Sequence, residues 1–151
     1  HLGSTMPTST HAVMQKQAIE WAQTFAQCVR NKDLLAALPL FSPKVHSYGT
    51  RVVEACNRNQ LHDGQWTPTW HRTQGFDYLP GSIDVQLSSD ASVAIVCALW
   101  RSEGVDSPES WGLQQPYERT GRCTFVLTKN HHNAWVCTHS HFSLNPGQGS
   151  N

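Results

Sequence analysis

The spacing of apolar residues changes along this chain from a helical period to a strand period. Within residues 14–29, apolar side chains recur at three- and four-residue steps and polar side chains fill the other positions. This spacing predicts an amphipathic helix that lies on a core. A second short helix is predicted from Leu34 to Leu38. Asp33 can cap its start, and we expect the helix to stop near Pro39 because proline cannot continue it.

The C-terminal half carries patterns typical of strands. They predict an antiparallel meander over residues 83–87, 91–101, 121–128 and 134–144, with a shorter strand at residues 45–50. Gly64 and Pro68 weaken the helical pattern of residues 59–70, so we expect a short or irregular helix there. Residues 102–116 lack periodicity and predict a long loop. Helices followed by a run of strands predict an α+β domain, with the helices on one face of the sheet.

The length of 151 residues is that of a single domain. We expect residues 11–145 to form that domain and residues 146–151 to be a frayed tail. Residues 1–10 are expected to be disordered, and the part before Met6 reads as a cloning remnant followed by a natural start.

The charge balance argues against two classes of partner. Eleven basic side chains are balanced by eleven acidic ones, so no excess positive charge attracts nucleic acid or an anionic membrane surface. The longest apolar stretches fall well short of the ~20 residues that cross a bilayer. The chain also lacks the glycine-rich and nucleophile-elbow motifs, and we expect no cofactor.

Cysteine usage indicates a reducing compartment. The five cysteines form an odd, scattered set without a C-x-x-C pair, which argues against a disulfide framework and a zinc ribbon. We therefore expect a cytoplasmic protein.

Several segments together resemble a known family. They are Leu40-Phe41-Ser42-Pro43, Ser47-Tyr48-Gly49-Thr50-Arg51, Gln65-Trp66 with Trp70, Gly121 to Leu127, and Trp135-Val136-Cys137-Thr138-His139-Ser140-His141-Phe142-Ser143. They are similar to the SnoaL-like family of the nuclear transport factor two-like superfamily, and the last stretch is the most specific. The resemblance implies a cystatin-like cone, in which helices wrap a strongly curved, mainly antiparallel sheet around an internal pocket. It also implies frequent homodimers through the sheet.

That superfamily includes ketosteroid isomerases, polyketide cyclases and dehydratases, as well as assembly domains. No motif of this sequence matches their catalytic sets residue by residue, so the resemblance carries no catalytic role to any position.

The last predicted strand places two histidines on one face. Because strand side chains alternate, that face would hold Trp135, Cys137, His139, His141 and Ser143. A two-residue turn at His132 and Asn133 would set the hairpin register, with the cross-strand pairs Arg122 with Ser143, Thr124 with His141, and Val126 with His139.

This register suggests a candidate site. His139 or His141 could act as general acid or base, with Arg122 and Thr124 binding the ligand. The alternative is a half-exposed sheet face or a dimer seam, with both imidazoles hydrogen-bonded. A metal site would need a third ligand such as His46, and since nothing in the spacing demands one, we expect no metal.

Aromatic residues suggest the apolar part of a pocket. Tyr48, Thr50, Trp66 and Trp70 are expected to line it, although such spacing is also typical of plain core. Arg119 and Arg122 fall on opposite strand faces by parity and cannot share one site unless a bulge intervenes.

The sequence thus predicts a small-molecule-binding domain of unassigned activity, with a pocket lined by aromatic, histidine and arginine side chains. One alternative is a cofactor-independent isomerase, cyclase or dehydratase that uses a strand histidine. Another is a dimerisation module. The expected partners are a small-molecule ligand and a second copy of the chain.

Overall fold

The computed structural model describes the backbone of residues 2–105 and 116–148, and the side chains of residues 10–105 and 116–148. The N-terminal half holds α1 (Leu2–Asn31), α2 (Leu34–Ala37), η1 (Leu38–Leu40), β1 (Phe41–Tyr48), α3 (Arg58–Leu61), η2 (His62–Trp66) and α4 (Thr67–Trp70). The remaining strands are β2 (Thr73–Tyr78), β3 (Asp84–Leu87), β4 (Val93–Gly104), β5 (Tyr117–Lys129) and β6 (Trp135–Leu144).

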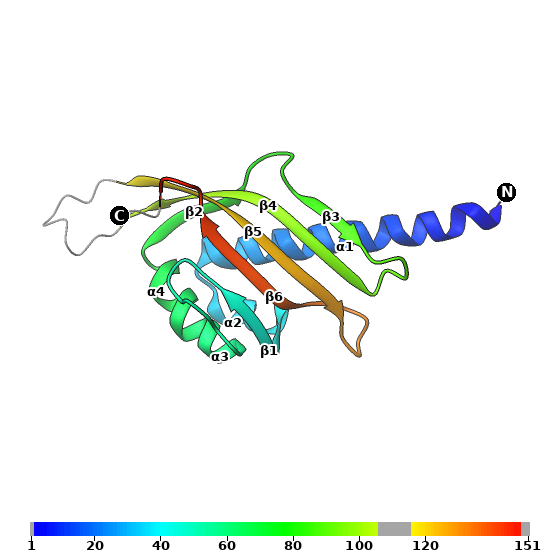
Figure 1. The fold of residues 1–151 in the computed structure, drawn as a ribbon, viewed down its shortest axis with the longest axis horizontal. Helices are drawn as coiled ribbons and strands as arrows, with labels where there is room; N and C mark the ends of the chain where they lie inside the picture. The colour runs from blue at the N-terminus through cyan, green and yellow to red at the C-terminus, as the bar shows by residue number, and fades with distance from the viewer. Residues whose placement is uncertain (1, 106–115, 149–151) are drawn as a thin grey trace, which may run out of the picture.

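The strands form one curled, mixed sheet of six strands. Its order is β1-β6-β5-β4-β2, and β3 pairs separately with β4. All pairings are antiparallel except that of the edge strand β1 with β6. The long helix α1 crosses one face of the sheet, and the short helices gather beside β1 (Figure 1). The expected α+β architecture with a curved, mainly antiparallel sheet is therefore confirmed.

The helical predictions hold with shifted ends. Helix α1 begins at Leu2, before the predicted start at residue 14, and α2 is capped by Asp33, whose carboxylate accepts from the backbone N–H of Ala36 at 3.0 Å. The irregular helix predicted for residues 59–70 is the sequence of α3, η2 and α4, in which η2 is a π-helical turn. Such turns widen a helix locally and re-aim its side chains.

Strand β2 was not predicted. Its sequence contains Gly75, which adopts a positive φ of 68°, and its pairing with β4 shifts register between Gln74 and Asp77. A glycine in a short polar segment weakens the strand pattern, so pairing with β4 rather than local propensity forms this strand.

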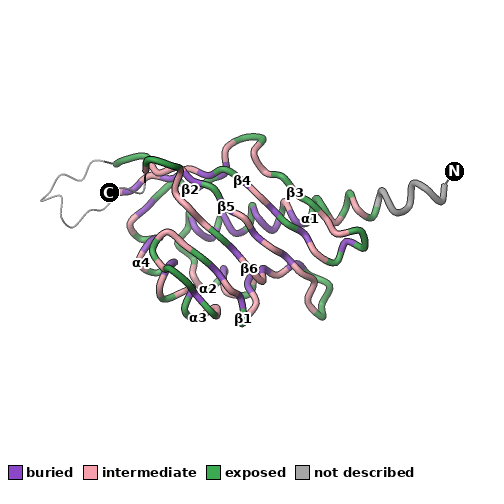
Figure 2. The backbone as a smooth tube through the Cα atoms, viewed as in Figure 1, coloured by how far each residue is buried: buried purple, intermediate pink, exposed green. Residues whose placement is uncertain are grey.

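The core consists of aromatic side chains between α1 and the sheet. Phe25 packs its ring against Phe41, Phe125 and Trp70, with centroids 5.2–5.9 Å apart, and Trp21 lies 4.9 Å from Phe125. Along β4 and the middle of β5, buried positions alternate with more exposed ones (Figure 2). Aromatic burial from both layers therefore holds α1 on the sheet.

A bulge in β6 decides which side chains face this core. The predicted pairs Arg122 with Ser143, Thr124 with His141, and Val126 with His139 are all present. The register then shifts, so that Leu127 pairs with Cys137 and Lys129 with Trp135. The turn is consequently longer than the two residues predicted, and Thr138 is the extra residue in β6.

Replacing a core ring tests this packing. Phe125 is 0% exposed, so Phe125→Ala should lower the free energy of unfolding by about 3–5 kcal/mol, because it leaves a cavity that the surroundings fill only partly. Urea denaturation measures the change. Leu99→Ala on the outer face of the neighbouring strand β4, where Leu99 is 46% exposed, is the control and should cost far less. Similar losses in both variants would contradict the described core.

Candidate functional site

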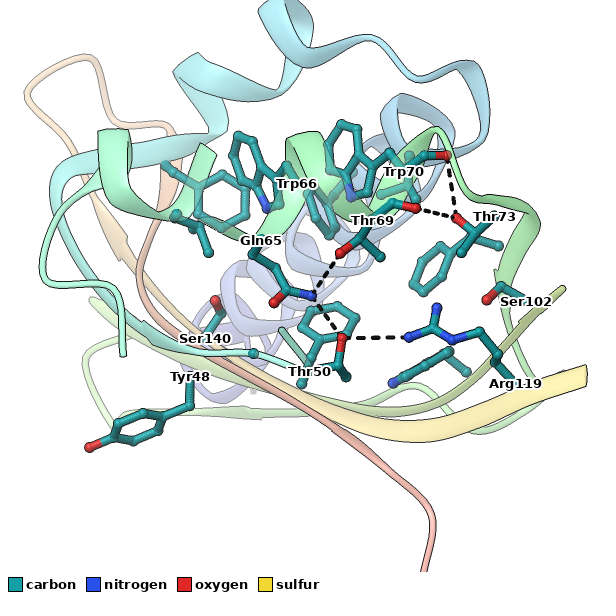
Figure 3. A pocket seen from close by; sticks show the side chains of 18 residues that line it. Tyr48, Thr50, Gln65, Trp66, Thr69, Trp70, Thr73, Ser102, Arg119 and Ser140 are labelled. Atoms are coloured by element: carbon teal, nitrogen blue, oxygen red, sulfur yellow. Dashed lines mark hydrogen bonds between the residues drawn. The ribbon is translucent and has the colours of Figure 1, made fainter. Parts of the chain in front are cut away.

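A narrow cavity lies between the helical segment 58–70 and the inner face of the sheet. Its free volume is about 50 Å³, several times what one water molecule needs. Trp66 and Trp70 stand on one side of it, and Arg119 and Thr50 lie on the opposite side (Figure 3). Much of the remaining wall is aromatic, from Phe25, Phe41, Phe76, Trp100 and Phe142. The site is thus a mostly apolar chamber with a few polar groups, as in many ligand pockets.

Gln65 holds the helical wall to the chain that follows β1. Its side-chain oxygen accepts from the backbone N–H groups of Arg51 at 2.7 Å and Val52 at 3.1 Å. Its amide nitrogen donates to Thr50 Oγ1 at 2.8 Å. A Cβ atom at Gly49 would overlap the Gln65 carboxamide, so the close approach requires glycine at this position. The amide therefore fixes where the Thr50 hydroxyl stands in the cavity.

Arg119 brings a positive charge to this wall. Its Nη2 donates to Thr50 Oγ1 at 3.5 Å, and its guanidinium lies 5.5 Å from the centre of the Trp100 ring. Burial lowers the pKa of Arg119, and the nearby Arg51 acts in the same direction. Among the described residues no carboxylate forms an ion pair with Arg119. Within the described part of the chain, the cavity thus contains a partly desolvated charge without a counter-charge.

Two further polar groups in the cavity wall lack hydrogen-bond partners among the described residues. The indole Nε1 of Trp100 and the hydroxyl of Ser102 are buried and make no hydrogen bond in the described structure, although both residues line the cavity. Each residue is only 2% exposed. A buried polar group without a partner costs about 1–3 kcal/mol, so such groups are rare in proteins unless something else supplies the partner.

An open groove adjoins the cavity at its polar end. That groove is lined by Arg51, Tyr117, Glu118 and Gln148, among others, and it shares Thr50 and Arg119 with the inner cavity. Arg119 therefore stands at the junction between an enclosed apolar chamber and a polar, open approach.

Four predicted ligand-binding residues border the cavity, although not all in the expected way. Thr50, Trp66 and Trp70 face into it, and the two indole rings stack with centroids 5.1 Å apart. Tyr48 borders it, but its ring points away (Figure 3) and packs against His139 and His141 on the outer face of the sheet. The chain turns at Gly49, which separates Tyr48 from Thr50.

The histidine face predicted from the sequence does not line the cavity. Before the bulge, the odd-numbered residues Trp135 and Cys137 are buried on the inner face. After the bulge, the even-numbered Ser140 is buried there instead. His139, His141, Arg122 and Thr124 consequently lie on the outer face. The strict alternation that predicted one shared face fails because Thr138 adds one residue to the strand.

On the outer face His139 belongs to a hydrogen-bonded chain. Nε2 of His46 lies 2.8 Å from the Glu54 carboxylate, and Nδ1 of His46 lies 3.2 Å from Nδ1 of His139. With its Nε2 proton donated to Glu54, a neutral His46 can only accept at Nδ1, so His139 is the donor. The two Nδ1 atoms share one hydrogen, since they cannot both carry a hydrogen at this distance.

The outer residues Arg122 and Thr124 make few contacts. Arg122 is exposed and donates to Ser143 Oγ at 3.3 Å, and the hydroxyl of Thr124 lies 3.8 Å from the Cys97 sulfur. No group of three metal-ligating side chains occurs in the part of the chain that the structure describes.

Sequence reasoning missed Gln65, Trp100 and Ser102 as site residues. The sequence does contain a signal for Trp100 and Ser102. Side chains of β4 alternate between the two faces of the sheet, so these two residues share the buried face. Parity also separates Arg119 from Arg122. The buried positions Cys123 and Phe125 of β5 share the face of Arg119, which therefore looks inward.

Fold and cavity together define the chain as an α+β cone with a small internal pocket, and comparison with known proteins identifies its class. The model of the SnoaL-like domain family matches residues 19–146. The chain belongs to this family, and the resemblance stated from the sequence is confirmed. A search among curated proteins gives no significant match.

Solved structures show the same fold. An NTF2-like superfamily protein from Salmonella enterica has a TM-score of 0.76 at 17% identity, covering 93% of this chain and 99% of that chain. A ketosteroid isomerase-like protein from Erwinia carotovora atroseptica scores 0.72 at 13% identity, with coverages of 87% and 95%. An NTF2-like protein with a cystatin-like fold from Novosphingobium aromaticivorans also scores 0.72 at 13% identity, with coverages of 97% and 92%.

Removing the unpaired hydroxyl tests the cavity wall. Ser102→Val should raise the free energy of unfolding by about 1 kcal/mol, because it removes a buried polar group without a partner and adds apolar contact in a strand. Ser143→Val on the outer face is the control and should stay within about 0.5 kcal/mol of wild type. Urea denaturation compares the two, and a destabilised Ser102→Val protein would show that the hydroxyl has a partner.

The histidine chain makes stability depend on pH. The pKa of His139 is lowered, first by burial and then by His46 and His141, so the unfolded chain binds this proton more readily than the folded protein. The free energy of unfolding should therefore fall as the pH drops through the ordinary histidine range, between about pH 7.5 and 5.5. His139→Gln should flatten this part of the profile. Equal slopes in both proteins, measured by urea denaturation at several pH values, would contradict the assignment.

Proposed function

We propose that this SnoaL-like domain binds a small molecule in the inner cavity, with an apolar part against the tryptophans and a polar part toward Arg119. The observation that carries the proposal is an aromatic chamber whose wall contains the unpaired Trp100 indole N–H and Ser102 hydroxyl. A bound molecule would supply the partners that these groups lack.

Binding fits the lining of the cavity better than acid–base catalysis does. Of the described residues that line it, none is Asp, Glu, His or Lys, so the chamber offers no ordinary general base. Catalysis by His139 or His141 would have to act on a molecule held on the outer face, away from the cavity. The likeness to a ketosteroid isomerase-like protein concerns the fold and gives no support to catalysis in this cavity.

The outer face of the sheet supports a second part of the proposal, a homodimer. Exposed apolar side chains of Tyr48, Ile95 and Leu99 lie there, together with His139 and His141. An apolar sheet face with hydrogen-bonding groups suits association with a second copy.

We also propose that the protein is located in the cytoplasm. All five cysteines are free in the structure, which fits a reducing cytoplasm. No helix in the described part of the chain is both long enough and apolar enough to cross a membrane.

Binding is tested with benzyl alcohol as a neutral aromatic probe, observed by saturation-transfer NMR and titration. Thr73 is 7% exposed and lines the cavity, so Thr73→Leu should fill the chamber and weaken binding by about tenfold or more. Thr124→Leu makes the same exchange on the outer face and should leave binding unchanged. Equal binding by both variants would overturn the proposal, and thermal unfolding confirms that each is folded.

A further inference from the structure

The polar groups left open in the cavity are nearly all hydrogen-bond donors. We propose that the ligand carries a carboxylate group, which binds between the guanidinium of Arg119, the indole N–H of Trp100 and the hydroxyl of Ser102. This inference rests on the proposed function, because it names the chemical class of the molecule that the cavity takes: a small carboxylic acid with an aromatic or short aliphatic body.

Strand pairing brings the three donors together. Ser102 of β4 lies directly opposite Arg119 of β5, and Trp100 lies opposite Gly121. Residues two apart on one strand share a face, so Trp100 and Ser102 project to the same side as Arg119. A Cβ atom at Gly121 would overlap the Trp100 ring, and its absence lets the indole lie against β5 beneath the guanidinium.

A count of donors and acceptors shows what is missing. Guanidinium and indole N–H groups donate only. The Thr50 hydroxyl receives hydrogens from Gln65 and from Arg119, which occupies both of its lone pairs and leaves its own proton to donate. The complementary partner is a group that only accepts, and an ionised carboxylate offers two oxygens with about four acceptor positions.

The positive charge of Arg119 also favours a carboxylate ligand. The Arg119 guanidinium is partly buried and has no carboxylate partner among the described residues. A bound anion would offset the cost of removing this charge from water. The planar guanidinium can hold the two oxygens of a carboxylate side by side.

The surroundings favour a single negative charge over a phosphate. The inner cavity presents one guanidinium and no other cation among the described lining residues, whereas Arg51 lies in the outer groove. A dianion would remain half-compensated in an aromatic chamber, which is costly. The apolar body of the acid would then lie toward Trp66 and Trp70.

Two matched pairs of probes test the inference: benzoate with benzamide, and butyrate with butyramide. Within each pair the shape is similar, but the amide replaces one acceptor oxygen by a donor NH₂ group and removes the charge. Titrations followed by ligand-detected NMR should show that wild type binds the carboxylate about tenfold or more tightly than the amide, as for a charge-assisted pair.

Arg119→Met should abolish this preference while still binding the amide. Arg122→Met removes the same side chain from the outer face of the same strand, and it should keep the full preference. Trp100→Phe, which removes only the indole N–H donor from a similar ring, should reduce the preference by a few-fold.

The outcomes separate the two proposals. Equal binding of carboxylate and amide by wild type overturns the carboxylate inference and leaves small-molecule binding standing. A preference that survives in Arg119→Met places the anion elsewhere and also overturns it. If no carboxylate, no amide and no benzyl alcohol binds, the proposed function itself fails. The comparison within wild type needs no variant, so a misfolded Arg119→Met protein would not prevent the test.

Discussion

The extra residue at Thr138 in β6 sets the phase of this strand, and the site depends on that phase. Before the bulge, Trp135 and Cys137 are buried under α1; after it, Ser140 and Phe142 take over the inner face and border the cavity. Without the bulge, the imidazoles of β6 would face the aromatic chamber. Because side chains alternate in a sheet, a single inserted residue exchanges the two faces for the remainder of the strand.

The other side of the cavity depends on a polar tie. The carboxamide of Gln65, presented by the π-helical turn, bonds to the chain just after Gly49 and orients Thr50. An amide with its oxygen and nitrogen both engaged specifies one arrangement, since every alternative leaves a buried polar group unpaired. Gln65 thereby links the helical wall, through Thr50, to Arg119 on the opposite side of the chamber.

The sequence predicted the architecture well because periodicity and turn residues report local structure directly. The amphipathic pattern of α1 and the cap at Asp33 follow from local rules. The cross-strand pairs from Arg122 to Val126 match the prediction because the bulge in β6 offsets a turn longer than the predicted one. The site was predicted less well, because the inner face of β6 depends on a bulge that no residue type announces. Trp66 and Trp70 were recognised as lining residues. Ser102 and Trp100 were not, since their importance lies in the partners they lack, and only three-dimensional packing reveals that.

The free edge of β1 is protected against pairing with a further strand. Backbone groups of Ser47 pair with Ala55 at 2.9 and 2.8 Å, and earlier in the strand Pro43 offers no N–H and Lys44 carries an exposed charge. These are means by which natural sheets avoid growing edge to edge. Contacts between copies along this side of the sheet would have to be made by side chains, and the protein is thereby guarded at β1 against open-ended strand addition, the first step toward fibrous aggregation.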